Sequence, residues 1–408
     1  MNAALLNRRS FVVTLGLMTA AAALTVDVSL PAIPAMVEAL NTTLPRGQQI
    51  VGIFMAGMAL GQIPWGLFSD RLGRLPVLYV GLTVFTLAAI VAAIADSIEV
   101  MLAARFVQGV GASSPIVLSR AIVRDVAHGK EAARLMSLMT MIFTAAPVIA
   151  PSIGALLVAE WGWRAPFVLI VAAGVLIMLG VRVNLVETHT PNVDGHPVRQ
   201  LKNSFAEFFS YRQSIWALLL QILPPAGFMS VISVSAALIV EIYGYSLQVY
   251  GLIFASAGIS ILVGSFVNRI LVLRFTQMQL IGIGTALVGL ASGQMAIIAW
   301  LDHAPLWWLW PTVCLFMFTI AILMANSMVL ALDPLPRIAG VASSIIGTLS
   351  NIAGAAGAIL GAAIYDGTVR NSVIIMAVVG LVTVVIFLLR PIIAPGPIVQ
   401  HPKELARD

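Results

Sequence analysis

The feature of this sequence that most limits its fold is a series of apolar runs, each about as long as a membrane-spanning helix. Such a helix needs about 20 mostly apolar residues. Of the 408 residues, 60% are hydrophobic and only 10% are charged, whereas soluble domains carry about 25% charged residues. Lipid is therefore expected to cover most of the surface. Twelve runs are expected to span, at 11–34, 48–68, 76–95, 99–122, 135–159, 164–185, 214–238, 248–268, 278–301, 307–330, 338–364 and 371–390.

The longest polar segment, residues 187–212, separates the first six runs from the last six. We predict an N-terminal six-helix bundle over 1–186, a cytoplasmic linker over 187–212, and a C-terminal six-helix bundle over 213–408. A short pattern of the second span recurs 198 residues later, where Gly66, Phe68 and Arg71 meet Gly264, Phe266 and Arg269. A weak repeat at this offset indicates two similar halves. The expected fold is all-α, with twelve transmembrane helices in two pseudo-symmetric bundles.

The basic residues predict how the chain lies in the membrane. With the N-terminus inside, only Arg46, Arg164 and Arg370 of the 22 Lys and Arg residues fall outside, and Arg105 lies within a span. This bias predicts that both termini are cytoplasmic. The net charge of +5 comes from short loops between apolar runs. It therefore indicates membrane topology, and no nucleic-acid partner is expected.

The second span breaks into a short charged segment, SDRLGR at 69–74, before the third span begins. Hydrocarbon does not tolerate such a cluster, so the membrane surface lies near its start. Gly73 permits a tight reversal. Asp70 is expected either as a solvated loop charge or at a helix N-terminus, where the dipole favours an anion. A charge network that holds one conformation is expected at this surface, made of Asp70, Arg71, Arg120, Arg124 and Asp125.

Asp27 is the one acidic residue expected well inside a span. An aspartate near the centre of a membrane helix costs about 2.5–3.5 kcal/mol on insertion scales, so it should face protein or an aqueous cavity. Burial and nearby cations act oppositely on its protonation, so it could load and unload a proton. The alternative is a permanently paired structural aspartate. Arg105 lies at similar depth in the fourth span and is a possible partner.

Uncharged polar residues at membrane depth are candidates for a substrate cavity. An alternative for each is that it packs closely or bonds a neighbouring helix. Two prolines and a glycine in the fifth span are expected to bend it, because each proline removes a backbone hydrogen bond. The cavity candidates are Gln108, Ser113, Gln221, Asn326 and Asn351, and the bend residues are Pro147, Pro151 and Gly154.

Enzyme signatures are missing from the sequence. There is no phosphate-binding loop, no nucleophile elbow and no pair of histidines at metal-ligand spacing. The single cysteine, Cys314, excludes an internal disulfide. We expect no enzymatic activity, no cofactor and no metal, so energy must come from an ion gradient or from the substrate's own gradient.

Several motifs resemble those of the major facilitator superfamily, and more narrowly its Bcr/CflA drug-resistance branch. They are GLFSDRLGR at 66–74, RFVQGVG at 105–111, DVSLPAIP at 27–34, VRD at 123–125, the Pro147, Pro151 and Gly154 set, and AGVASS at 339–344. The resemblance implies that Asp27 carries the coupled proton and that Arg105 is the buried cation of coupling. It also implies that Asp70, Arg71, Arg74 and Arg124 latch the cytoplasmic side against Asp125 and the eleventh helix. Gly340 lies at the beginning of that helix and belongs to the same latch.

The sequence departs from the branch in two places. The branch commonly has an aromatic residue at Ser29, and some multidrug members have a second acid where this chain has Thr19. A single intramembrane acid argues against export of doubly charged cations.

We predict proton-coupled efflux of small, largely apolar drugs, such as chloramphenicol- or bicyclomycin-like compounds, across a bacterial inner membrane by alternating access. The expected partners are the drug, protons and the bilayer, and the chain is expected to be a monomer. One alternative is transport of an endogenous metabolite such as a sugar, siderophore or amino-acid derivative. Another is a non-transporting membrane sensor.

Overall fold

The computed structural model describes residues 9–127, 129–189, 197–302, 304–335 and 338–398, all of them in helices or short connections. Twelve helical segments in this part of the chain are long and apolar enough to cross a membrane, as predicted. The chain termini, the middle of the predicted linker and two short loop segments lie outside the described residues.

The first bundle holds the first six spans. Its elements are α2 (Arg9–Ser29), η1 (Leu30–Ala32), α3 (Ile33–Ala39), α4 (Leu44–Leu72), α5 (Arg74–Ala93), α6 (Ile98–Val126), α7 (Gly129–Trp161) and α8 (Ala165–Asn184). Within it, α2 packs on α7 and α8, α4 and α5 pack on α6, and α5 packs on α8.

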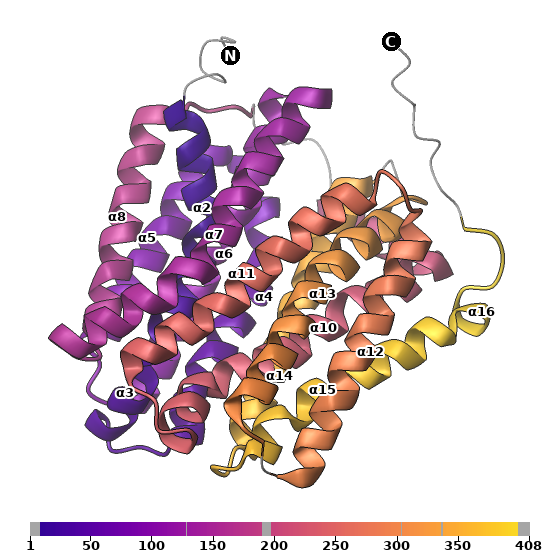
Figure 1. Cartoon of the computed structure of the whole chain (residues 1–408). Helices are drawn as coiled ribbons and strands as arrows, with labels where there is room; N and C mark the ends of the chain where they lie inside the picture. The colour runs from indigo at the N-terminus through magenta and orange to yellow at the C-terminus, as the bar shows by residue number, and fades with distance from the viewer. Residues whose placement is uncertain (1–8, 128, 190–196, 303, 336–337, 399–408) are drawn as a thin grey trace.

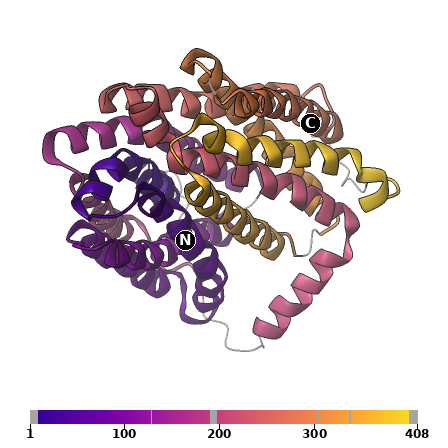
Figure 2. The same ribbon diagram turned by 90° about the horizontal axis from the view of Figure 1, so that it is seen from below.

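The second bundle follows after α9 (Pro197–Ser210). Its elements are α10 (Arg212–Ala237), a π-helical turn η2 (Leu238–Ile242), α11 (Leu247–Leu271), α12 (Gln277–Leu301), α13 (Leu306–Leu332), α14 (Ala339–Ile364), α15 (Val369–Leu388) and α16 (Arg390–Ile393). Here α10 packs on α13, α14 and α15, and α12 packs on α13 and α15. The two bundles stand side by side (Figure 1), and Figure 2 shows each as its own cluster of helices.

Successive spans are antiparallel because the connections are short. We call the side where α2 begins, α8 ends and α10 begins the linker side, and the opposite side the far side (Figure 1). Several spans start at a side-chain cap, which satisfies a backbone N–H that the helix cannot. The hydroxyl of Ser97 accepts from Val100 N at 3.4 Å, and Thr276 forms a reciprocal capping box with Gln279.

The predicted linker contains a helix that the sequence analysis did not identify. α9 lies within the polar segment 187–212, yet Phe208 on its apolar side is fully buried and Phe205 packs on the same core. A helix that is polar overall can still bury one face when its aromatic residues recur three to four positions apart.

Candidate functional site

Asp27 lies two residues before the end of α2, and only 7% of its surface is exposed. The helix ends here because Pro31, four residues on, has no N–H to donate to the Asp27 carbonyl. The chain continues through the tight turn η1 into α3. Among the described residues, no hydrogen bond or ion pair reaches the Asp27 carboxylate. The possible ion pair with Arg105 is therefore not formed in this conformation.

Arg105 is fully buried in α6 and is held by neutral groups. Its Nη1 donates to Gln108 Oε1 at 2.8 Å, and Nε donates to the Ile50 carbonyl of α4 at 3.4 Å. Nη2 donates to Ser29 Oγ at 3.4 Å, at the end of the helix that carries Asp27. A buried cation is tolerable only when its donors are satisfied. Arg105 therefore connects α6 to α2 and α4 without a carboxylate.

Two aromatic rings complete the pocket around Arg105. Its guanidinium carbon lies 4.6 Å from the ring centroid of Phe54 on α4 and 5.9 Å from that of Phe167 on α8. The ring faces attract a cation, more strongly where water is absent. A fixed positive charge thus sits among four helices of the first bundle, close to the end of α2.

The end of α2 also meets the second bundle. The Val28 carbonyl packs so tightly on α7 that a Cβ at Gly154 would lie 2.3 Å from it. Tyr250 of α11 is fully buried, lies within electrostatic range of Asp27, and shares a 3.1 Å hydrogen bond with Ser235 of α10. The buried acid of the first bundle therefore lies within electrostatic range of a polar side chain of the second.

One close contact between the bundles joins α4 to α14. A Cβ at Gly52 would lie 3.0 Å from the Ala355 carbonyl. Towards the linker side, Thr348 Oγ1 donates to Gln62 Oε1 at 3.2 Å. Gln62 is ten residues, about 15 Å, from the linker-side end of α4. The α4–α14 contact therefore lies mainly towards the far side.

A second close contact joins α7 to α11, at the predicted bend residues. Both prolines lie inside α7, which is continuous. Because Pro151 has no N–H, the Pro147 carbonyl has no partner in its own helix. A Cβ at Gly258 of α11 would lie 3.0 Å from that oxygen, and Ser152 Oγ donates to the Gly251 carbonyl at 3.1 Å.

We call these two contacts, α4–α14 and α7–α11, the far seam. Leu44, at the far end of α4, also packs on Val234, Ala237 and Tyr365 of the second bundle. The backbones approach most closely where glycines meet them, and such faces let membrane helices pack without a hydrophobic driving force. The bundles are thus pressed together on the far side.

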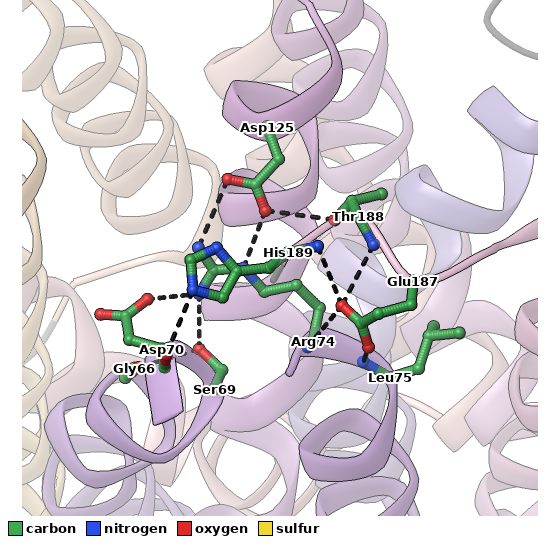
Figure 3. A network of polar contacts seen from close by, with 9 residues as sticks. All are labelled: Gly66, Ser69, Asp70, Arg74, Leu75, Asp125, Glu187, Thr188 and His189. Carbon is green, nitrogen blue, oxygen red and sulfur yellow. Dashed lines mark hydrogen bonds and ion pairs between the residues drawn. The ribbon is translucent and has the colours of Figure 1, made fainter. Parts of the chain in front are cut away.

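A network of charges lies on the linker side of the first bundle (Figure 3). Arg74, at the start of α5, donates through Nε to Asp125 Oδ2 at 2.8 Å and through Nη1 to Ser69 Oγ at 2.8 Å. Its Nη1 also pairs with Asp70. The Arg74 side chain is only 7% exposed, so these charge-assisted bonds are partly shielded from water and stronger than surface pairs. They join α4, α5 and α6.

The structure changes several expectations about this network. Asp70 lies in the last turn of α4 and not at a helix N-terminus, because α4 continues to Leu72. Arg71 and Arg124 are exposed, and neither forms a hydrogen bond or ion pair within the described residues. Gly340 lies in the first turn of α14, and the described bonds of the network stay within the first bundle and the linker. The latch role of these residues remains a prediction.

The five predicted cavity residues occupy different environments. Gln108 bonds Arg105, while Ser113 packs against Gly61 of α4. Asn326 donates to Asn268 Oδ1 at 2.7 Å, so it bonds α13 to α11, which was the alternative left open for it. Gln221 is buried, and its Oε1 has no partner among the described residues. Asn351 shares the face of α14 that meets α4 at Gly347 and Gly354.

Sequence reasoning missed part of the linker-side network. Glu187 Oε1 accepts from Arg74 N at 2.9 Å and Oε2 accepts from Leu75 N at 2.9 Å. Thr188 Oγ1 donates to Asp125 Oδ2 at 3.1 Å, and His189 Nε2 lies 3.1 Å from the Asp70 carbonyl. The only signal was an acid directly after an apolar run, which the sequence analysis assigned to the linker.

Comparisons with known proteins agree with this architecture. The family model of the Major Facilitator Superfamily matches residues 15–358. The chain is 28% identical over 344 residues to a "Bicyclomycin resistance protein homolog" of Haemophilus influenzae, covering 83% of this chain and 85% of the relative. It is also 28% identical over 361 residues to "Multidrug resistance protein D" of Escherichia coli, covering 88% and 90%.

Solved structures share the fold at low identity. A D-xylose-proton symporter superposes with a TM-score of 0.76 at 15% identity, covering 93% of this chain and 96% of the symporter. A bacterial homologue of the human lysosomal transporter Spinster gives 0.72 at 17% identity, covering 94% and 97%. Twelve spanning helices in two bundles, drug-resistance relatives and this shared fold describe a multi-pass bacterial inner-membrane transporter. With the family model covering most of its length, the chain belongs to the major facilitator superfamily.

Proposed function

We propose that the protein exports small, largely apolar drugs in exchange for protons, by alternating access of a site between its two bundles. The relatives named for bicyclomycin and multidrug resistance support drug export. Exchange for protons rests on Asp27, a buried acid at the junction of the bundles that has no partner among the described residues. A carboxyl group in that position gains or loses a proton as its surroundings change.

The position of Asp27 supports coupling between its protonation and the bundle arrangement. It lies beside Val28, which packs on α7, and within electrostatic range of Tyr250 on α11. Parting of α7 and α11 would change what surrounds the carboxylate. Opening on the far side would expose the carboxylate to protons from that side, and re-closing would shut that route. Arg105 supplies a fixed cation nearby, so a change in its contacts with Ser29 would act on the same carboxylate.

We propose that the linker side faces the cytoplasm. Arg46, Arg164 and Arg370 lie at far-side helix starts, whereas the other basic residues in the described loops and helix ends lie on the linker side. In this orientation the far seam closes the site towards the outside. Asp27 would take a proton from outside in the other conformation and release it inside in this one, which then favours drug binding.

The polar groups near the bundle junction favour an uncharged or singly charged drug. Gln221 and Asn351 are neutral, and Asp27 is the one acid in that region of the described spans. A doubly charged cation would leave one charge uncompensated in a low-dielectric site, at a high cost. We propose that the protein works as a monomer, which light scattering of the purified protein in detergent tests.

The deciding experiment measures drug movement in proteoliposomes under an imposed proton gradient. Asp27→Asn keeps the size of the side chain but cannot exchange a proton, so gradient-driven export of a chloramphenicol-like drug should be lost. Asp96→Asn, at an exposed aspartate in the α5–α6 connection, is the control and should export normally. Full gradient-driven export by Asp27→Asn would refute proton coupling through this residue.

A susceptibility panel in a host that lacks its own pumps tests the substrate class. Expression should raise resistance to at least one apolar antibiotic. No change for any drug, together with proton-linked uptake or release of a sugar or siderophore in vesicles, would favour a metabolite carrier instead.

A further inference from the structure

The first turn of α5 is capped by a residue that lies more than 110 positions away in the sequence. The residue before α5 is Gly73, which has no side chain and cannot cap the helix. The first N–H groups of a helix have no acceptor within it. Glu187 supplies both missing acceptors, one carboxylate oxygen to Arg74 N and the other to Leu75 N, each at 2.9 Å (Figure 3).

Gly73 also leaves the space that this carboxylate occupies. Its φ of 95° lies in the region that side chains rarely adopt. A Cβ at this position would lie 2.9 Å from Glu187 Oε2 and 3.2 Å from its Cδ. Glycine at the corner between α4 and α5 therefore leaves room for the Glu187 carboxylate in the position observed.

The next two residues contact the other two helices of the network. Thr188 Oγ1 donates to Asp125 on α6, and His189 Nε2 lies against the Asp70 carbonyl in the last turn of α4 (Figure 3). The backbone N–H groups of Thr188 and His189 donate to Glu187 Oε1 at 3.1 and 3.0 Å. Three consecutive residues thus touch α4, α5 and α6 at once.

We propose that Glu187, Thr188 and His189 form a clasp that fixes the beginning of the inter-bundle linker to the charge network, with Glu187 as the positioning residue for Arg74. The carboxylate holds the Arg74 backbone, and the Arg74 side chain reaches Asp125 and Asp70 from that point. The chain continues from the clasp towards α9 and the second bundle. Because α9 packs on α10 and α14 of the second bundle, we expect movement of that bundle to act on the clasp.

This inference rests on the proposed function as a transporter only for its effect on rate. The clasp lies far from Asp27 and from the far seam, on the linker side. We therefore expect it to change how fast the bundles exchange conformations and not how tightly a drug binds.

The test uses the full-length protein with Glu187→Gln, which replaces one acceptor oxygen by an amide donor facing a backbone N–H. Hydrogen exchange at the first turn of α5 should accelerate by about tenfold, the usual scale for loss of a helix cap. The maximal export rate should fall several-fold while the drug dissociation constant stays the same. The control is Glu131→Gln, at an exposed glutamate in the first turn of α7 on the same side.

A double-mutant cycle with Asp125→Asn tests whether Glu187 acts through Arg74. Residues that share one network give non-additive effects, so the double variant should lose little more export rate than Asp125→Asn alone. Unchanged exchange in Glu187→Gln, an unchanged export rate despite faster exchange, or additive effects in the cycle would each overturn the proposal. If the wild type exports no drug, the proposed function fails, and faster exchange at the first turn of α5 in Glu187→Gln still decides whether the clasp exists.

Thr188→Val provides an independent variant if Glu187→Gln does not fold. It removes the hydrogen bond to Asp125 and keeps the shape of the side chain. It should reproduce the rate defect in weaker form, and a rate equal to that of the wild type would contradict a role for the clasp.

Discussion

Substitution of Gly258 by alanine should shift the protein towards the conformation that is open on the far side. The added Cβ would lie 2.9 Å from both the Pro147 carbonyl carbon and the Val148 nitrogen. These are backbone atoms, so the contact cannot be relieved by a side-chain rotation. Overpacking of this kind costs about 1–3 kcal/mol. The cost disappears once α7 and α11 part, so all of it acts on the equilibrium between conformations.

The expected shift is about 5- to 150-fold in the population ratio, because 1.4 kcal/mol corresponds to a factor of ten. Spin labels at Trp161, the far end of α7, and Tyr245, in the connection just before α11, would report it; both residues are exposed. The labels are introduced as cysteines in a Cys314→Ala background. Electron paramagnetic resonance should show a larger share of long distances in Gly258→Ala.

The matched control is Gly293→Ala in α12, where an added Cβ meets no atom within 4 Å. Both substitutions gain about 1 kcal/mol of helix propensity, so their difference isolates the contact with α7. Distance distributions that agree between Gly258→Ala, Gly293→Ala and the unsubstituted background would refute the view that the α7–α11 contact closes the far side.

Three further predictions concern single polar groups. Gln48 is fully buried, and neither the oxygen nor the nitrogen of its side-chain amide has a partner among the described residues. Gln48→Leu should therefore stabilise this conformation by about 1–3 kcal/mol and raise the melting temperature. A lower melting temperature would contradict this. Burial raises the pKa of Glu187, but four backbone N–H donors outweigh it and hold the pKa below its ordinary value of 4.5. Its cap should then be fully present above pH 4.5 and lost only as the pH falls through the lowered folded-state pKa, which hydrogen exchange at the start of α5 checks; loss of protection between pH 5 and 7 would contradict it. Asn326→Leu leaves Asn268 unpaired, at a cost of about 1–3 kcal/mol, so it should lower the melting temperature with drug affinity unchanged. The double variant with Asn268→Leu should recover part of the lost stability. Weaker drug binding by Asn326→Leu would instead support a cavity role for Asn326.

The spans were predictable because their signal is local. A run of apolar residues long enough to cross lipid is visible without knowing any contact. The helices are nonetheless longer than predicted at several ends, as for α4, expected at 48–68 and observed at Leu44–Leu72. Hydropathy marks where hydrocarbon ends, and a helix can continue into the polar region beyond it.

The partners of the site residues were not predictable because they are distant in sequence. The choice between Arg71 and Arg74 shows why. Arg71 lies in the last turn of α4 and is exposed, while Arg74 follows the reversal at Gly73 and bonds Asp125. Two arginines three residues apart look alike in sequence, and the geometry of the turn decides between them. Glu187 likewise gave no sign that its carboxylate caps α5.

The two halves differ chemically at equivalent places, although the repeat that links them was visible in sequence. Asp70 matches Asn268 at the repeat offset. In the first bundle, α4 is joined to α6 by the charges of Asp70, Arg74 and Asp125. In the second, α11 is joined to α13 by the neutral amides of Asn268 and Asn326. Charges act over longer distances than amide dipoles and respond to a neighbouring backbone cap. The linker is fixed to the charged network of the first bundle and continues into the second bundle, whose equivalent contact is neutral. Movement of the bundles would therefore act selectively on the charged network of the first bundle.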